Sequence, residues 1–299
     1  MKDHLTFALA SVAMLACALL ALVGCGQADM PQESLRNTTE ISQSSGTMNV
    51  SFIDVGKGDC ILVQADDAAV LIDTGFDDTA DEVVAYLHEQ GVNRLRGVVI
   101  THYDRDHVGG LNAIGKAINI DTVFLPGYEG ADKNYRTAMT AIENLGVPAL
   151  PVTEVQTLEL NEAELTILPT ALSYIPGSNG DEGNDNDLSL VVTLIFRDDS
   201  FLFAGDLEKK GIAAYLKNSQ GHFDVLKMPH HGQKNSNTDD LLDEVQPTFV
   251  IVTDDPSSPA DRKTLNLIED VGAETYRTST DGTIVITSDG SGSYSVSTR

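Results

Sequence analysis

The sequence of 299 residues predicts a mixed α/β fold in which two β-sheets are covered by helices. Short β-branched runs recur along the chain, and amphipathic helical patterns lie between some of them. The runs first follow one another directly and later alternate with helices, an order that favours two packed sheets. No G-x-G-x-x-G pattern occurs in the sequence, which argues against a dinucleotide-binding fold.

The individual elements follow from local patterns. Strands are predicted at residues 50–53, 61–63, 70–72, 98–101, 123–125, 165–168, 190–196, 201–203, 225–228, 249–252 and 283–287. Helices are predicted at residues 78–90, 135–145, 207–216 and 262–271. The first of these begins with acidic residues, places Val83, Val84 and Leu87 on one face, and ends at Gly91, as amphipathic helices do.

The composition is strongly acidic. The chain has 19 basic and 45 acidic residues and a formal net charge of −26, while 41% of its residues are hydrophobic, enough for a buried core. Such a charge argues against a broad basic surface for nucleic acid. Phosphate chemistry is still allowed, because bound metal ions can supply local positive charge. Three cysteines without a C-x-x-C pair exclude a disulfide framework and a thiolate zinc site.

The N-terminus predicts export. Residues 5–23 form an apolar run that ends at Leu22-Val23-Gly24-Cys25, which resembles the lipobox of bacterial lipoproteins. This resemblance implies that residues 1–24 are a cleaved signal peptide and that Cys25 carries the lipid anchor at the extracytoplasmic face of the membrane. The alternative is an uncleaved membrane-spanning helix, which would also leave the chain exported and tethered. Residues 25–47 are polar and predict a flexible tether, and residues 48–299 predict one domain.

Two further features favour structural roles. The segment 173–187 is rich in Gly, Asn and Asp and predicts a loop, and it lacks the spacing of an EF-hand calcium site. Cys60 is expected to be a small buried residue, because no His/Asn arrangement singles it out as a nucleophile.

A cluster of potential metal ligands follows the predicted strand 98–101. His102, Asp104, Asp106 and His107 lie within six residues in an H-x-D-x-D-H pattern, and a Gly-Gly pair after them allows a sharp turn. Imidazole nitrogens and carboxylate oxygens are the ligands of catalytic zinc, manganese or iron. The spacing therefore predicts a metal site at the end of this strand.

Two other strands end in residues of the same kind. The strand at 201–203 leads into Ala-Gly-Asp206, and the strand at 225–228 leads into Pro-His230-His231-Gly. A Gly-Asp turn alone is common and would be read as structural. Together with the His/Asp cluster, three strand ends deliver ligands toward one site, as in dinuclear hydrolases.

The motifs H-x-D-x-D-H-x-G-G, F-x-G-D and P-H-H-G resemble the metallo-β-lactamase fold, which implies a four-layer αββα sandwich. Residues 52–59, 71–75, 227–234 and 276–285 are similar to the hydrolase domain of the DNA-uptake competence proteins. The resemblance covers about residues 48–298. Because the hydrophobic channel helices of the competence proteins are absent, it implies a stand-alone, secreted hydrolase domain.

The resemblance also implies residue roles. His102 and Asp104 take the positions of first-metal ligands, Asp106 and His107 serve the second metal, and Asp206 bridges the two. The last ligand is His230 or His231, and the position just before the glycine favours His231. His230 then becomes a supporting group or proton donor. The residues expected to support the ligands from outside are Asp54, Asp59, Asp73 and Asn186.

This sequence departs from the family pattern at the first metal. Most members have a second histidine where Asp104 stands, and the third histidine expected before the strand 190–196 is missing, with Asn186 or Asp187 near that point. Oxygen donors in place of imidazoles favour manganese or magnesium over zinc. We therefore expect two divalent ions, manganese or zinc, with magnesium as a further candidate.

The resemblance and the ligands together predict phosphodiester hydrolysis by a water that two metal ions activate. Asp106 would orient the nucleophile as well as bind metal, and His230 is the candidate acid for the leaving group. Lys234 and Ser236, just beyond the histidine pair, are candidates for contacts with phosphate oxygens, although a solvated turn explains them equally well.

The substrate stays open at the level of sequence. The competence resemblance points to DNA, and Lys227 and Lys234 flank the histidine pair as a compact basic cluster, but the net charge and the lack of tryptophan argue against a stacking groove. The alternatives are smaller esters such as phosphocholine or cyclic dinucleotides, and, less favoured, a β-lactam. A further alternative is an inactive relative that binds metal as a binding module. No protein partner can be identified.

Overall fold

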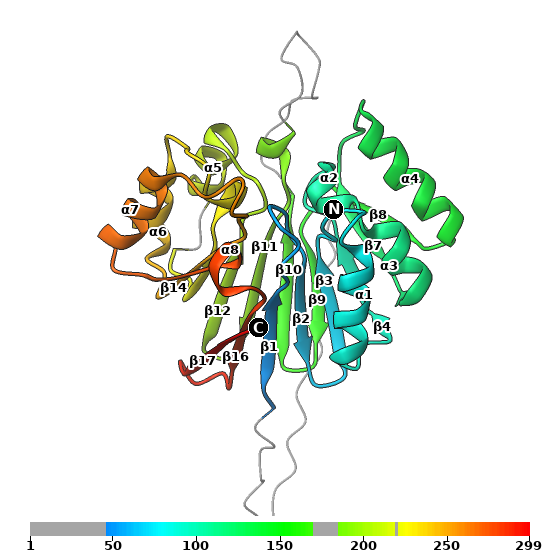
Figure 1. The fold of residues 1–299 in the computed structure, drawn as a ribbon, viewed down its shortest axis with the longest axis horizontal. Helices are drawn as coiled ribbons and strands as arrows, with labels where there is room; N and C mark the ends of the chain where they lie inside the picture. The colour runs from blue at the N-terminus through cyan, green and yellow to red at the C-terminus, as the bar shows by residue number, and fades with distance from the viewer. Residues whose placement is uncertain (1–45, 170–184, 219–220) are drawn as a thin grey trace, which may run out of the picture. The chain divides into compact units, whose positions relative to one another are not determined.

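The chain folds into two large β-sheets that pack face to face (Figure 1). The structure, a computed structural model, describes residues 46–169, 185–218 and 221–299. The predicted signal peptide, Cys25, nearly all of the tether and residues 173–184 of the predicted loop lie outside these ranges. Residues Ser44–Arg299 form one compact unit.

The first sheet has eight strands and the second has seven. In spatial order the first contains β17 (Tyr294–Thr298), β16 (Ile284–Ser288), β1 (Met48–Phe52), β2 (Ile61–Ala65), β3 (Ala68–Ile72), β5 (Gly97–Val99), β7 (Val123–Pro126) and β8 (Ala149–Val152). The second contains β15 (Glu274–Arg277), β14 (Phe249–Val252), β13 (Val225–Lys227), β12 (Asp199–Phe203), β11 (Val191–Phe196), β10 (Ala163–Leu168) and β9 (Gln156–Leu160). A separate pair consists of β4 (Arg94–Leu95) and β6 (Asn119–Ile120).

Helices cover the outer face of each sheet. Those on the first sheet are α1 (Ala80–Glu89), α2 (Arg105–Val108), α3 (Leu111–Ala117) and α4 (Lys133–Leu145). Those on the second are α5 (Lys209–Leu216), α6 (Thr238–Val245) and α7 (Arg262–Asp270). The short elements α8 (Thr278–Asp281), η1 (Asn186–Leu188) and η2 (Pro229–Gly232) lie in connections between strands. None of the helices in the described residues is long and apolar enough to cross a membrane.

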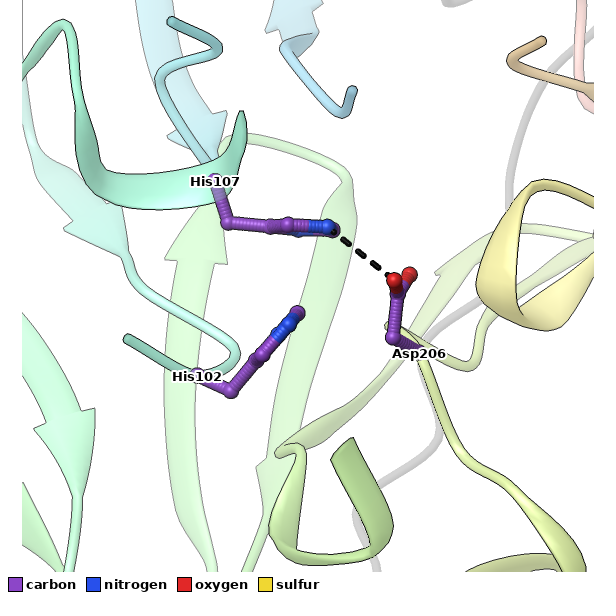
Figure 2. A group of neighbouring side chains, drawn as sticks. All are labelled: His102, His107 and Asp206. Carbon is purple, nitrogen blue, oxygen red and sulfur yellow. Dashed lines mark ion pairs between the residues drawn. The ribbon is translucent and has the colours of Figure 1, made fainter. Parts of the chain in front are cut away.

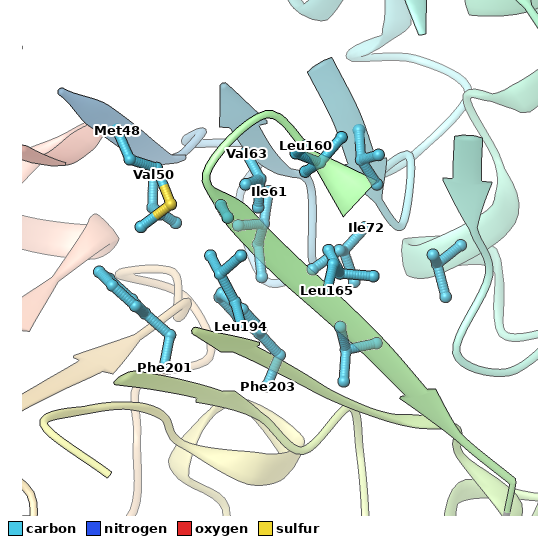
Figure 3. Close-up of a cluster of buried hydrophobic side chains, with 14 of the residues drawn as sticks. Met48, Val50, Ile61, Val63, Ile72, Leu160, Leu165, Leu194, Phe201 and Phe203 are labelled. Carbon is cyan, nitrogen blue, oxygen red and sulfur yellow. The ribbon is translucent and has the colours of Figure 1, made fainter. Parts of the chain in front are cut away.

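The core between the sheets follows from strand alternation. On β10, Leu165 and Ile167 are buried against the opposite sheet while Glu164 is exposed, as a period of two residues requires. Leu194 and Phe203 of the second sheet meet Val63 of the first in this layer (Figure 3). Two further apolar layers lie between each sheet and its helices. The predicted four-layer αββα sandwich is therefore confirmed.

The topology brings the carboxyl ends of four strands, those that carry the predicted site residues, to one edge of the two sheets. The strands β3 and β5 run parallel in the first sheet, and β12 and β13 run parallel in the second. The carboxyl ends of parallel strands meet at the same edge of a sheet, where open α/β folds bind ligands. Residues that follow these four strands are thus placed near one another.

All strands and helices predicted from sequence are present, with boundaries shifted by a few residues. The helix expected at 135–145 begins two residues earlier because the Asp132 side chain accepts a hydrogen bond from the Tyr135 N–H at 2.8 Å. Elements that sequence missed include the edge strand β8 and its follower β9, which are largely exposed. The helix α6 was also missed, because its eight residues carry only a short apolar face.

The cysteine at position 60 is part of the core, as the sequence predicts. Cys60 is fully buried and unpaired, and it packs with the apolar layer beneath the helices of the first sheet. Burial raises the pKa of its thiol well above the usual value, with the nearby Asp73 and Asp59 charges adding to the shift. A thiol in that state is a poor nucleophile.

The inter-sheet core gives a stability test. We expect Leu194→Ala to lower the free energy of unfolding by about 2–5 kcal/mol, because Leu194 is fully buried between the sheets and leaves a cavity. Its neighbour Ile195 points outward and is 40% exposed, so Ile195→Ala should cost less than about 1 kcal/mol. Urea unfolding of both variants measures the difference. Equal losses would contradict the assigned layer.

Candidate metal centre

The first part of the site is a tight turn after β5. His102 follows the strand, Asp104 precedes α2, and α2 itself carries Asp106 and His107. The two glycines after α2 allow this turn to press against the loop after β3. A Cβ atom at Gly110 would lie 2.2 Å from the Thr74 carbonyl oxygen, a distance no side chain tolerates.

The second part is the turn after β12, which carries Asp206. Its preceding residue, Gly205, has a φ of 52°, and a Cβ atom there would lie 2.8 Å from the Ser189 Cβ. The Asp206 N–H donates to the Ser189 Oγ at 3.2 Å. Close packing therefore fixes the backbone that presents this carboxylate.

The third part follows β13 and holds the histidine pair. His230 and His231 both have left-handed backbone conformations, with φ of 47° and 52°. Such conformations cost about 1–3 kcal/mol each for residues other than glycine, and they cluster at functional sites. The resulting turn buries His231 completely and leaves the His230 side chain 23% exposed.

The three parts converge on the Asp206 carboxylate. Its Oδ2 lies 3.3 Å from His107 Nε2 and 3.1 Å from His231 Nε2. His231 Nε2 is also 3.4 Å from Asp106 Oδ2, and the rings of His102 and His107 are 4.0 Å apart. Figure 2 shows His102 and His107 extending from one side toward Asp206 on the other.

The polar atoms at the centre are suited to a divalent metal. The Nε2 atoms of His102, His107 and His231 and the Asp206 Oδ1 are buried and have no hydrogen-bond partner among the described residues. Buried polar atoms normally have hydrogen bonds, so three imidazole nitrogens that face carboxylates without such a bond are suited to hold a cation. The ligand atoms of His102, His107 and Asp206 lie within 4.8 Å of one another, as do those of Asp106, His107 and His231. Imidazole and carboxylate donors at this spacing fit a transition metal.

Asp73 holds the first cluster from outside. One of its carboxylate oxygens accepts the Thr101 N–H at 2.7 Å, and the other lies 2.7 Å from both the Thr101 hydroxyl and His107 Nδ1. This orients His107 so that Nε2 faces the centre, as carboxylate partners of metal-binding histidines do. Asp73 itself has a φ of 57°, a further strained residue at the site.

Asp59 supports the third cluster. Its Oδ1 accepts the Thr253 hydroxyl at 2.6 Å, and that hydroxyl oxygen lies 3.1 Å from His231 Nδ1. Its Oδ2 pairs with the ammonium of Lys227, which is fully buried. Thr101 and Thr253 were not singled out from sequence, and both are hydroxyl residues within two positions of a strand end.

The central carboxylates stay ionised despite their burial. Burial by itself would raise the pKa of Asp206, but the charges of His231 and His107 hold it well below its usual value. Burial also opposes ionisation of Asp106, but the nearby His231 imidazole and the charge of His107 lower its pKa. Both groups are therefore available as anionic donors at neutral pH.

The histidines respond in opposite directions. Burial would lower the pKa of His107, but the Asp206 and Asp73 carboxylates raise it well above the usual value. A metal at Nε2 takes the place of that proton, so binding releases protons. Burial lowers the pKa of His230, whose Nδ1 is 3.1 Å from Glu208 Oε1.

The predicted first-metal residues are placed unequally. His102 is fully buried, while the Asp104 side chain is 44% exposed, with its Oδ2 3.6 Å from His102 Nε2. The neighbouring His102 imidazole lowers the pKa of Asp104. Near the expected third histidine, Asp187 Oδ1 accepts the Gly211 N–H at 2.7 Å.

Other predicted residues lie outside the central group. Asn186 donates to Glu208 Oε1 at 3.3 Å, and Glu208 Oε1 in turn lies 3.1 Å from His230 Nδ1. Asp54 is exposed, and its carboxylate accepts the Gly56 N–H within its own loop at 3.1 Å. Lys234 and Ser236 are exposed beyond the histidine turn.

Lys227 requires a correction. The sequence suggested that it could join Lys234 in a basic cluster for DNA, but its side chain has no exposure. As the last residue of a strand buried on both faces it points inward, where it pairs with Asp59. It therefore faces Asp59 and Asp206 from inside the protein.

Comparisons with known proteins agree with this geometry. The sequence profile of the Metallo-beta-lactamase superfamily matches residues 53–252. ComE operon protein 3 of Bacillus subtilis is 26% identical over 260 residues, or 79% of this chain and 32% of that protein. Recombination protein 2 of Haemophilus influenzae is 28% identical over 215 residues, or 70% of this chain and 24% of that protein. The chain thus spans about a quarter to a third of the length of these curated relatives.

Solved structures show the same fold. The metallo-beta-lactamase fold protein YhfI of Bacillus subtilis matches with a TM-score of 0.52 at 12% identity, covering 81% of this chain and 100% of that one. A variant of the CmlA beta-hydroxylase matches with a TM-score of 0.52 at 14% identity, covering 80% of this chain and 53% of that one. From the profile match over residues 53–252 and the sequence relatives, this chain belongs to the metallo-beta-lactamase superfamily and is related to competence proteins.

Proposed function

We propose that this protein is a metal-dependent hydrolase of phosphodiesters, with nuclease activity as the leading form. The convergence of three buried histidine Nε2 atoms on the Asp206 carboxylate supports the proposal most directly. A site of this kind, reached from the carboxyl ends of four strands, is typical of hydrolases that use two metal ions.

Two divalent ions fit the donor set, with manganese ahead of zinc and magnesium as a further candidate. Asp106, His107 and His231 would hold one ion, His102 and Asp104 the other, and Asp206 would lie between them. The oxygen donor at position 104 favours a hard cation. Bound divalent ions in such sites lower the pKa of water and stabilise negative charge on the reacting group.

The chain's own residues have distinct tasks in this reaction. Asp106 is ionised and faces His231, so it can orient the attacking water as well as bind metal. His230 is partly exposed, and its Nδ1 lies against the Glu208 carboxylate. An ionised carboxylate only accepts hydrogen bonds, so Nδ1 is the nitrogen that carries the proton in the neutral ring. With its Nδ1 proton donated to Glu208, the neutral ring has no proton at Nε2. His230 therefore acts as the acid only after Nε2 has taken up the proton that the attacking water loses, which it then gives to the leaving oxygen.

Two observations bear on the substrate. The names of the relatives include Recombination protein 2 and Competence protein ComA, and they favour DNA. The net charge of −26 and the burial of Lys227 argue against an extended basic surface, and they favour a smaller diester such as a phosphocholine ester or cyclic dinucleotide. DNA remains the first candidate, approached as a short or single-stranded segment.

The place of action follows from the N-terminal sequence. We propose that residues 1–24 direct export and that a lipid at Cys25 ties the protein to the outer side of the cytoplasmic membrane. The substrate would then be met outside the cytoplasm.

The proposed activity is tested with a substrate panel. Protein freed of metal and resupplied with manganese, zinc or magnesium should hydrolyse bis(p-nitrophenyl) phosphate or linear DNA. Asp106→Ala should lower turnover by more than about 100-fold, since even the outer partners of metal ligands cost about 10–100-fold. Asp77→Ala, which removes an exposed carboxylate paired with Arg105, is the control and should keep activity.

The same panel contains the alternatives. Hydrolysis of a phosphocholine ester or a cyclic dinucleotide without DNA cleavage would assign the smaller substrates. Turnover of a chromogenic β-lactam alone would overturn the proposal, as would full activity of Asp106→Ala. Metal binding without turnover of any substrate would identify a binding module.

The adjacent histidines make a matched test of metal binding. His231→Asn should weaken manganese binding by more than about 100-fold, because the Nε2 at the centre is lost. His230→Asn should change the affinity for manganese by less than about 3-fold, because His230 is not one of the proposed ligands. Its Nε2 lies 4.0 Å from the Asp206 Oδ2, and its Nδ1 faces Glu208. Asparagine tolerates the left-handed backbone at both positions. Titration calorimetry measures both, and a reversed order would identify His230 as the ligand.

The exposed residues after the histidine turn are tested by kinetics. If Lys234 and Ser236 contact phosphate, the Lys234→Ala/Ser236→Ala variant should raise KM about 5-fold with kcat nearly unchanged, the size expected of exposed ionic contacts. Lys116→Ala, which removes an exposed lysine on α3, is the control. Unchanged KM in the double variant would show that this turn is merely solvated.

A further inference from the structure

Lys227 is a fully buried cation at the inner side of the metal centre. Among the described residues, it is the lysine that the fold encloses completely. Its ammonium pairs with the Asp59 Oδ2, donates to the Gly205 carbonyl at 3.1 Å, and lies 3.5 Å from the Asp206 Oδ1. Burying a lysine is costly unless it is paired, so these contacts are required to hold it there.

The contact with Gly205 acts on the backbone that presents Asp206. The same carbonyl oxygen also accepts the N–H of His230 at 3.2 Å. Lys227 therefore fastens the turn after β12 to the turn after β13. Its charge beside Oδ1 restrains the Asp206 carboxylate while Oδ2 faces the histidines.

A second path runs through Asp59. Lys227 holds one oxygen of Asp59, and the other oxygen accepts the Thr253 hydroxyl, which contacts His231 Nδ1. The Asp59 Oδ2 is also 3.8 Å from His107 Nδ1. The buried ammonium thus contacts Asp206 directly and reaches His231 and His107 through Asp59. It does not face solvent.

We propose that Lys227 is a positioning residue that sets the placement of Asp206 and His231 for metal binding. This inference rests on the metal site of the proposed function, and it is independent of which ester is hydrolysed. In this role Lys227 organises the ligands before a metal ion arrives and does not take part in substrate binding.

The test compares Asp59→Asn with Asp59→Asn/Lys227→Met. Asparagine at position 59 can still accept the Thr253 hydroxyl, so the path to His231 is retained. The double variant removes one positive and one negative charge and leaves the local net charge as in the wild type. The single variant keeps Lys227 but adds one unit of positive charge, which by itself disfavours a cation.

A role through charge and a role in positioning predict opposite orders of manganese affinity for these two variants. If Lys227 acts through charge alone, the double variant should bind manganese more tightly than Asp59→Asn. If it positions the ligands, the double variant should bind about 10–100-fold more weakly than wild type and also more weakly than Asp59→Asn. Calorimetric titration with manganese decides between them, with thermal unfolding to verify the fold. Asp199→Asn, a buried acid at the opposite end of β12, controls for buried-charge loss and should keep wild-type affinity.

A measurement on the wild-type protein covers the case in which the double variant does not fold. With lysine side chains labelled with ¹⁵N, the buried ammonium should give a resonance protected from exchange, and adding zinc should shift it. Absence of a protected ammonium, or a resonance unmoved by bound zinc, would overturn the inference. Failure of the wild type to bind any metal would instead refute the proposed function.

Discussion

The Asp206 carboxylate is the point on which the candidate site depends. It faces His107 and His231 at 3.3 and 3.1 Å with one oxygen, and its other oxygen lies near Lys227. An anion buried this deeply would be protonated unless cations surrounded it. Here the imidazoles, the buried ammonium and the proposed metal ions stabilise the negative charge. The packing of the turns and the proposed chemistry therefore both depend on this one side chain.

The two sheets make this arrangement rigid at the expense of local strain. Asp73, His230 and His231 have positive φ values, and glycines at 110 and 205 are needed where turns pack against one another. Strained conformations persist when the surrounding packing determines them. The apolar layer between the sheets supplies that packing, since the strands that it fixes are those whose ends carry the ligands.

The acidity of the chain has two different meanings. Part of the negative charge lies at the site, where Asp59, Asp73 and Asp206 are buried and form ion pairs with histidines or Lys227. The rest gives the surface an excess of negative charge that repels polyanions. A phosphate substrate would therefore be attracted by the metal ions at the centre and opposed by the surface around it.

The sequence by itself determined two sheets covered by helices, and its resemblance to a known family implied the αββα order. It also predicted which residues gather at the centre, because H-x-D-x-D-H, Gly-Asp206 and the His-His pair each follow an apolar strand and their spacing is local. It also predicted that Asp73 braces the site. Only the tertiary structure decided which histidine of the pair is buried and that Lys227 is enclosed. Those outcomes depend on which way a turn folds and on what packs against it from distant segments, such as Asp59 and Thr253, which are 194 residues apart. Local patterns carry no information on such contacts, since the partners are brought together only when the two sheets close on each other.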